Sequence, residues 1–288
     1  MGLQTIYVVR HGFRQTWPDS EGQAAREQGI FGPADASLSP HGFDQATELA
    51  AYAIRLNPPV GAIYSSPMIR CLQTVAPTVN RAAEEGKNRI PLRIEHGLGE
   101  WFGADGAHDY TPSSLSALKD QFPACSSDYV SLSPPILHGE DVEQLHNRLA
   151  GILTHLIARA DEEGHSAILL CSHAAVVVAI GHVLLGRVHQ DVTTKAIGAF
   201  TCGVSTYTRN LDAPNVIKTL SKADNEHLGL WSLTVNCDCS FLTNGAERGW
   251  RFSGLSRFTR KPLELGDEVD DGTGLGVVVN ASSATLGK

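Results

Sequence analysis

No segment of the 288-residue sequence approaches the run of ~18 consecutive apolar residues that a membrane helix needs. The N-terminus also lacks the basic stretch, apolar stretch and small-residue cleavage site of a secretory signal. We therefore expect a protein that is not secreted, has no membrane partner and works in the cytoplasm or the nucleus. With 42% hydrophobic residues the chain is not disordered, and its length predicts one large domain or two modest ones.

Several motifs of other enzyme classes are missing. The six cysteines include no C-x-x-C pair, which argues against a zinc ribbon or a thioredoxin motif. None of them has an arginine six positions later, so the thiolate loop of tyrosine phosphatases is absent. The sequence also has no G-x-S-x-G nucleophile elbow and no P-loop. We expect reduced thiols and no structural metal.

Basic residues are in the minority: 23 Lys and Arg stand against 31 Asp and Glu, for a net charge of −8. A protein that binds nucleic acid directly needs a basic face to displace counterions from the phosphates, so we expect no nucleic-acid partner. A small phosphorylated ligand needs only local positive charge in a pocket. The overall acidity further predicts that such a ligand has a neutral or apolar leaving group.

Short apolar runs alternate with helical patterns along the chain. Runs typical of buried strands lie at residues 5–9, 60–64, 90–94, 167–171 and 200–207. Helical patterns begin at Ser39, a predicted N-cap followed by Pro40, and lie at 68–79, 113–122, 141–160 and 174–185. A late strand at 230–237 is typical of an antiparallel edge.

This alternation predicts an α/β fold with three αβα layers: a mostly parallel central sheet with helices on both faces. We expect one domain over residues 1–258, with a core at 1–210 and a C-terminal strand extension. A polar, flexible tail is expected at 259–288.

Reactive side chains follow four of the predicted strands, and ligands of open α/β sheets bind beyond the carboxyl ends of strands. These side chains are Arg10, His11, Arg14, Arg70, Glu100 and His173. Arginine forks match phosphate oxygens, a histidine can attack phosphorus and carry the phosphoryl group, and a carboxylic acid can protonate the leaving oxygen. Together these residues predict phosphoryl transfer without a metal or other cofactor.

Four motifs carry a family resemblance: Arg10-His11-Gly12, SSPMIRCLQT at 65–74, GLGEW around Glu100 and Ser172-His173-Ala174. They resemble the histidine phosphatase (phosphoglycerate mutase-like) superfamily, and the resemblance spans about residues 5–207. It implies that His11 is the phosphorylated nucleophile and that Arg10, Arg70 and His173 bind the phosphate. It also implies that Glu100 is the proton donor, which we expect to be protonated in the free pocket.

Arg14 completes an R-H-G-x-R opening that is similar to a phosphatase-like branch of the superfamily. This opening, together with GLGEW and FTCGVSTY, resembles a fungal group that contains the phosphatase-like 55 kDa subunit of transcription factor tau and stand-alone relatives. By this resemblance Arg14 also binds the phosphate.

Three functions compete on this pocket. The leading hypothesis is a metal-independent phosphatase that hydrolyses a small phosphomonoester through a phosphohistidine. The second is a phosphatase-like scaffold or interaction subunit of a transcription complex, since fold does not dictate function; the partner is then a protein complex, and a homo-oligomer also stays open. The third, a phosphoglycerate-type mutase, is disfavoured because residues 101–139 lack an evident basic cluster for a second anion.

The residues around the site are less defined. Alternative proton donors to Glu100 are Glu95, Asp105 and Asp109, and supporting hydrogen-bond donors are Ser65, Ser172 and Gln15. Aromatic residues of the loops at 13–37 and 101–139 either line the mouth of the pocket or pack these loops down: Trp17, Phe31, Trp101, Phe102 and Tyr110. Substrate specificity is expected to come from these two loops.

Overall fold

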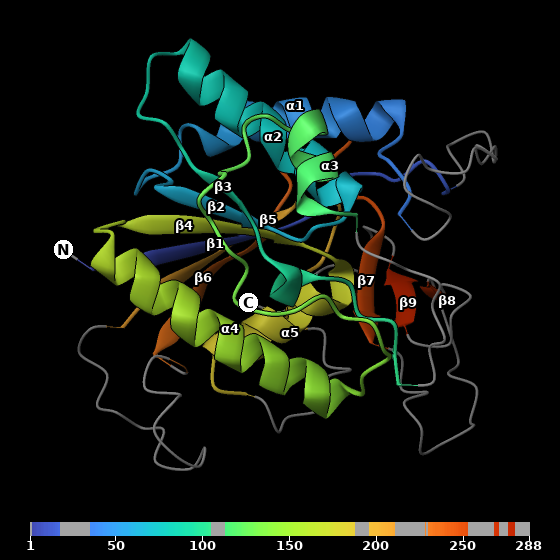
Figure 1. Cartoon of the computed structure of the whole chain (residues 1–288). Helices are drawn as coiled ribbons and strands as arrows, with labels where there is room; N and C mark the ends of the chain where they lie inside the picture. The colour runs from blue at the N-terminus through green and yellow to red at the C-terminus, as the bar shows by residue number, and fades with distance from the viewer. Residues whose placement is uncertain are drawn as a thin grey trace.

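The computed structural model describes residues 2–17, 35–104, 113–187, 196–210, 228 and 230–252, and the backbone of two strands at 268–270 and 276–279. A six-stranded sheet with the order β3-β2-β4-β1-β5-β6 runs through the middle (Figure 1). Its strands are β1 (Thr5–Arg10), β2 (Ala62–Ser65), β3 (Leu92–Ile94), β4 (Ala167–Ser172), β5 (Val204–Arg209) and β6 (Trp231–Asp238).

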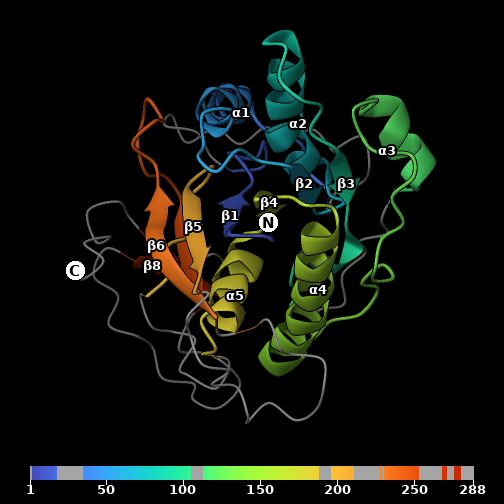
Figure 2. The same cartoon turned by 90° about the vertical axis from the view of Figure 1, so that its left-hand side faces the viewer.

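Helices cover both faces of this sheet. α1 (Pro40–Ala53), α2 (Ile69–Glu84) and α3 (Leu115–Gln121) lie on one side, and α4 (Val142–Glu162) and α5 (Ala174–Leu184) on the other (Figures 1 and 2). A short 3-10 helix, η1 (His96–Leu98), follows β3. The predicted three-layer α/β fold is confirmed.

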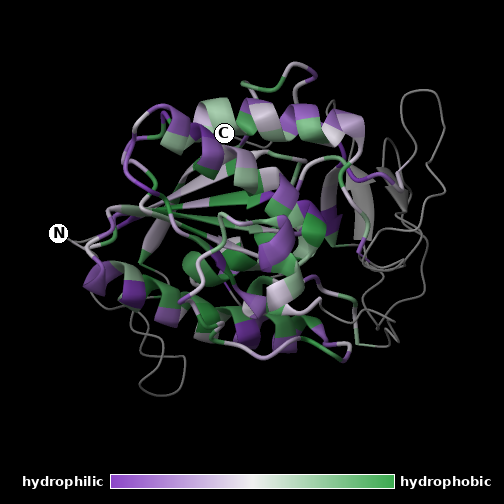
Figure 3. Cartoon of the chain, turned by 45° about the horizontal axis from the view of Figure 1, so that its top comes forward, coloured by the Kyte–Doolittle hydropathy of each residue, from purple (hydrophilic) through white to green (hydrophobic). Residues whose placement is uncertain are grey.

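Alternating residues of β1 pack into two different hydrophobic cores. Ile6 and Val8 pack in the cluster under α4 and α5, whereas Tyr7 and Val9 pack in the cluster under α1 and α2. Successive side chains of a strand point to opposite faces, so a run without polar residues is buried on both sides. Figure 3 shows the result as a mostly hydrophobic sheet between helices with mixed surfaces.

Local signals set where the helices begin. The Ser39 hydroxyl accepts a hydrogen bond from Gly42 N at 3.1 Å, with Pro40 at the first helical position, as the sequence predicts. α4 begins with a capping box in which Asp141 and Gln144 satisfy each other's backbone N–H groups. These capping interactions fix the residue at which α1 and α4 begin.

The strands β3, β2, β4 and β1 pair in parallel, whereas β5 pairs antiparallel with both β1 and β6. The predicted antiparallel edge strand at 230–237 is β6. Two further strands, β8 (Glu268–Asp270) and β9 (Gly276–Val279), form a second sheet of order β7-β9-β8 with β7 (Gly249–Phe252).

The strands β8 and β9 fall inside residues 259–288, which the sequence predicts as a polar, flexible tail. The structure instead has two strands in this range. The short apolar run of β9 pairs with β7 in antiparallel register, from Gly249 opposite Val279 to Phe252 opposite Gly276. The division of the chain at residue 258 stays a prediction. Among the described helices, none is both long and apolar enough to cross a membrane.

Candidate active site

The carboxyl ends of β1, β2 and β4 meet at one edge of the sheet. Arg10 pairs with Ser172, and Ser65 pairs with Cys171, so the residues that follow these strands leave the sheet side by side. His11 and His173 come directly after β1 and β4, and their ring centroids are 5.3 Å apart. Parallel pairing therefore brings together motifs that are 162 residues apart in the sequence.

His11 is 2% exposed and held by its own backbone turn. Its Nδ1 donates to the carbonyl oxygen of Gly12 at 2.8 Å, which leaves the lone pair on Nε2. Burial, followed by the charges of Arg70 and Arg10, lowers the pKa of His11 well below its usual value. The imidazole is therefore neutral at pH 7, the state in which its nitrogen is a nucleophile.

The backbone after His11 is held by two helices. Gly12 N donates to the Thr74 hydroxyl of α2 at 3.0 Å, and Phe13 N donates to Oε1 of Gln45 in α1 at 2.9 Å. Gly42 allows α1 to approach this turn, because a Cβ at that position would overlap the carbonyl oxygen of Phe13. These contacts give Gly42 and Gln45 a physical role in placing the turn that follows His11.

Arg70 lies in the first turn of α2 and is 2% exposed. Its Nη2 is 3.3 Å from Oε2 of Glu100 and 3.1 Å from Nδ1 of His173. Its Nη1 lies 3.7 Å from Oδ1 of Asp35, which accepts a hydrogen bond from Ile69 N at 3.0 Å. Burial raises the pKa of Asp35 to about 6, against the attraction of Arg70.

Glu100 and His173 form a close pair. Oε2 of Glu100 is 3.2 Å from Nδ1 of His173, whose Nε2 is 2.8 Å from the Ser66 hydroxyl. Burial raises the pKa of Glu100, but the His173 and Arg70 charges and the Trp101 N–H outweigh it and lower the pKa to about 2. Burial lowers the pKa of His173, whereas the neighbouring Cys71 sulfur and Glu100 carboxylate raise it above its usual value.

The expectation that Glu100 is protonated in the free pocket is therefore wrong. The carboxylate is ionised because a guanidinium and an imidazole both lie within 3.3 Å of it. The proton of this pair resides on His173. The sequence identifies Glu100 as an acid but does not show that Arg70 and His173 lie beside its carboxylate.

Glu95, an alternative proton donor, has a different role. Its buried carboxylate accepts hydrogen bonds from the Tyr129 hydroxyl at 2.6 Å, the Ser131 hydroxyl at 2.8 Å and Leu132 N at 2.9 Å. Glu95 therefore holds the segment at 129–133 against the core. The other two alternatives, Asp105 and Asp109, lie outside the described residues.

Three arginines surround the ring of Trp17. The guanidinium carbons of Arg14 and Arg248 are each 4.8 Å from its centroid, and that of Arg10 is 5.2 Å away. The same ring lies 5.7 Å from the ring of His11. Burial, the largest cause, lowers the pKa of Arg10 to about 9, and the neighbouring Arg14 and Arg248 charges act in the same direction.

Several buried donors in this cluster have no hydrogen-bond partner among the described residues. They are Nε of Arg10, Nε and Nη1 of Arg70, and Nε of Arg248. Buried donors normally find an acceptor, so these point to a ligand that supplies oxygens. The site as a whole fits an anion.

One atom from each of His11, Glu100 and His173 lies within 4.8 Å of the others, a spacing that also suits a metal ion. Arg70 hydrogen-bonds this carboxylate and lies beside His173. A cation placed among the three would face that guanidinium directly, at a distance where like charges repel strongly. The charges around the three residues favour an anion.

The structure thus gathers all six predicted site residues, and it adds Ser66, Asp35 and Arg248, which sequence reasoning missed. Two of the three expected supporting donors bond elsewhere: the Ser65 hydroxyl donates to Ser66 O and the Ser172 hydroxyl to Leu98 O. Of the five aromatic residues expected at the mouth, Phe31 and Tyr110 lie outside the described residues. Trp101 is buried with its Nε1 donating to Glu140 O, which packs its loop down.

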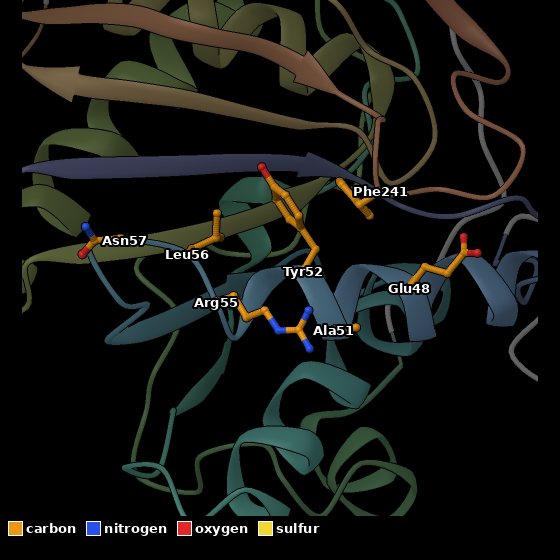
Figure 4. A pocket seen from close by; sticks show the side chains of 7 residues that line it. All are labelled: Glu48, Ala51, Tyr52, Arg55, Leu56, Asn57 and Phe241. Atoms are coloured by element: carbon orange, nitrogen blue, oxygen red, sulfur yellow. The ribbon is translucent and has the colours of Figure 1, made fainter.

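A separate pocket of ≈420 Å³ lies along α1 (Figure 4). It is lined by Glu48, Ala51, Tyr52, Arg55, Leu56, Asn57 and Phe241. The ring of Tyr52 stacks on Phe241 with centroids 4.1 Å apart. None of the histidines or arginines of the sheet edge lines this pocket, so we place the candidate site at the sheet edge.

Known proteins share this fold. A glucosyl-3-phosphoglycerate phosphatase from mycobacteria is 18% identical with a TM-score of 0.50, covering 81% of this chain and 98% of that one. An ecdysone phosphate phosphatase from Bombix mori is 12% identical with a TM-score of 0.51, covering 76% and 97%. At these identities the likeness shows the fold alone.

Comparison of the sequence gives two more specific matches. The 55 kDa subunit of transcription factor tau from Saccharomyces cerevisiae is 30% identical over 272 residues, which cover 88% of this chain and 59% of that protein. The sequence model of the histidine phosphatase superfamily (branch 1) matches residues 6–219. That match includes all six predicted site residues. The chain therefore belongs to the histidine phosphatase superfamily.

Proposed function

We propose that the chain is a metal-independent phosphatase that hydrolyses a phosphomonoester through a phosphorylated His11. The observation that carries this proposal is the buried, neutral His11 with its lone pair on Nε2, next to Arg10, Arg70 and His173 at one sheet edge. A neutral imidazole among cations is suited to attack an anionic phosphorus centre. The phosphatases of the same fold support the reaction class.

In the first step Nε2 of His11 attacks phosphorus, the bond to the ester oxygen breaks, and its electron pair stays on that oxygen. Arg10, Arg14 and Arg70 bind the phosphoryl oxygens and stabilise the charge that develops on them. The proton that the leaving oxygen needs comes from the His173–Glu100 pair.

The pair is suited to deliver this proton after the substrate binds. A phosphate dianion near Glu100 offsets the positive charge that holds its pKa at about 2, so the carboxyl group takes up a proton more readily. Glu100 or His173 then donates to the leaving oxygen. In the second step the same pair accepts a proton from water, which attacks phosphorus and releases inorganic phosphate and free His11.

Turnover of p-nitrophenyl phosphate tests the nucleophile. We expect His11→Ala to abolish turnover while circular dichroism shows an intact fold. His155→Ala is the matched control, because His155 is exposed on α4 and its Nδ1 bonds to Gly151 O of its own helix. Acid quenching after brief exposure to substrate should trap an acid-labile phosphoenzyme in the wild type. Wild-type turnover by His11→Ala, or repeated failure to trap the intermediate, contradicts the mechanism.

A second candidate function is a phosphatase-like interaction subunit of a transcription complex. The similarity to the tau 55 kDa subunit favours it, although this chain spans 59% of that protein. Affinity capture from cell extract combined with a phosphatase substrate panel separates the two functions. A stable multiprotein complex with no activity across the panel would favour the interaction subunit. A coupled assay tests a mutase, for which we expect no transfer to a second acceptor.

A further inference from the structure

Arg248 lies beyond residue 219, where the family match ends, yet its guanidinium reaches the site. Its Cζ is 4.8 Å from the centroid of Trp17, whose ring also neighbours His11, Arg10 and Arg14. The Arg248 side chain is half-buried, and its Nε has no hydrogen-bond partner among the described residues. It is a basic group of the site that the superfamily match does not supply.

The segment that carries Arg248 is fixed from both sides. Glu247 lies 2.6 Å from Nε2 of His41 and accepts from Nε2 of Gln45 at 2.8 Å, which ties it to α1. The Glu247 carbonyl accepts from Thr201 N at 3.1 Å.

Arg248 itself has a φ of 51°, a left-handed conformation that is uncommon outside glycine. In this conformation its carbonyl oxygen accepts a hydrogen bond from Nη1 of Arg10. The side chain is thus presented by a rigid turn rather than by a free loop.

Three guanidinium groups around one apolar ring repel one another. Cation–π contact with the indole offsets only part of this repulsion. The negative charge of Glu100 attracts Arg10, but the same carboxylate is already hydrogen-bonded to Arg70. In the proposed mechanism a phosphoryl group next to His11 uses Arg10, Arg14 and Arg70. Arg248, whose guanidinium also lies against the Trp17 ring, is then the additional positive charge that a second anion can use.

We infer that Arg248, beside the Trp17 ring, forms a second anionic subsite that binds a carboxylate or phosphate on the leaving group of the substrate. The inference rests on the proposed function, because it takes the phosphoryl group to lie at His11. It specifies the substrate class as phosphomonoesters with a second anionic group. It also replaces the expectation of a neutral or apolar leaving group that overall charge suggests.

Binding to the His11→Ala variant tests the subsite without turnover. The probes are phenyl phosphate and its 2-, 3- and 4-carboxy derivatives, which place a carboxylate at three distances from the phosphate. Isothermal titration calorimetry should show that the best carboxylated probe binds about 10- to 100-fold tighter than phenyl phosphate, the range of a charge-assisted hydrogen bond. Adding Arg248→Gln should reduce this preference to about 2-fold or less.

Arg55→Gln in the same background is the matched control, because Arg55 is exposed in the turn after α1, lines the separate pocket and should leave the preference unchanged. The salt dependence of the preference for carboxylated probes is a second test, and it does not require a variant of Arg248. Between 50 and 500 mM NaCl the preference should fall about 3-fold or more, since screening weakens a charge-carried preference.

Two results would overturn the inference: no carboxylated probe binds tighter than phenyl phosphate, or the preference survives both Arg248→Gln and high salt. Failure of the proposed function is seen separately, as absence of phenyl phosphate hydrolysis by the wild-type protein. If hydrolysis is absent while the preference depends on Arg248, the result supports the second anionic subsite and contradicts the phosphatase mechanism.

Discussion

Replacing Asp35 with asparagine should stabilise the protein at neutral pH and weaken its catalysis. The Asp35 side chain is 1% exposed, and its Oδ2 has no hydrogen-bond partner among the described residues. Burial raises its pKa from 3.8 to about 6, even with the attraction of Arg70 included. A shift of about 2 units corresponds to about 3 kcal/mol between the two protonation states.

The sign follows from linkage. An acid whose pKa is higher in the folded state favours folding only when protonated, so the free energy of unfolding falls as pH rises from about 4 through about 6. Asparagine keeps an oxygen that accepts from Ile69 N but carries no charge. At pH 7.5 the Asp35→Asn variant should therefore be about 2–3 kcal/mol more stable than the wild type, and at pH 4 the difference should approach zero.

Urea unfolding at both pH values measures the effect, with Asp120→Asn, an exposed position on α3, as the matched control. Because Asp35 lies 3.7 Å from Nη1 of Arg70, we also expect kcat/KM to fall about 10-fold as Arg70 loses its orienting charge. An equal stability difference at pH 4 and pH 7.5, or no gain at pH 7.5, would refute the reasoning.

Three further changes test the surroundings of the site. Glu95→Gln should lower the free energy of unfolding by about 2–4 kcal/mol in urea titrations, because the amide turns a donor toward groups that need an acceptor. Ser66→Ala should lower kcat about 10-fold and move the alkaline limb of the kcat/KM profile to lower pH, because protonated His173 loses its acceptor. Gly42→Ala should cost at least about 2 kcal/mol in thermal unfolding, because its methyl group overlaps the Phe13 carbonyl. Unchanged values for any of these variants count against the corresponding contact.

The fold could be predicted because its signals are local. Ser39 and Pro40 mark the start of α1, and the uninterrupted apolar residues of β1 mark a strand buried on both faces. The site residues could also be predicted, because Arg10 ends β1, and His11 and His173 directly follow β1 and β4, which pair in parallel. A residue at a strand end is placed by the sheet itself, whatever path the intervening chain takes.

The remaining features depend on contacts that have no local signal. Asp35 reaches Arg70 from a loop, and Arg248 reaches Trp17 from the turn before β7. Neither has a motif or a periodic pattern around it in the sequence. The ionisation of Glu100 depends on how close His173 and Arg70 lie, which only the folded geometry fixes.

The hydrogen bonds of Arg10 also bear on how the protein matures on the ribosome. Its Nη1 donates to the carbonyl oxygens of Ala199 and Arg248, which lie 189 and 238 residues further along the chain. At roughly 5–20 residues per second, the second acceptor is synthesised about 10–50 s after Arg10. For that time the nascent chain carries His11, the proposed nucleophile, beside an arginine that lacks this hydrogen bond. Arg10 therefore gains both of its carbonyl acceptors only after residue 248 has been synthesised.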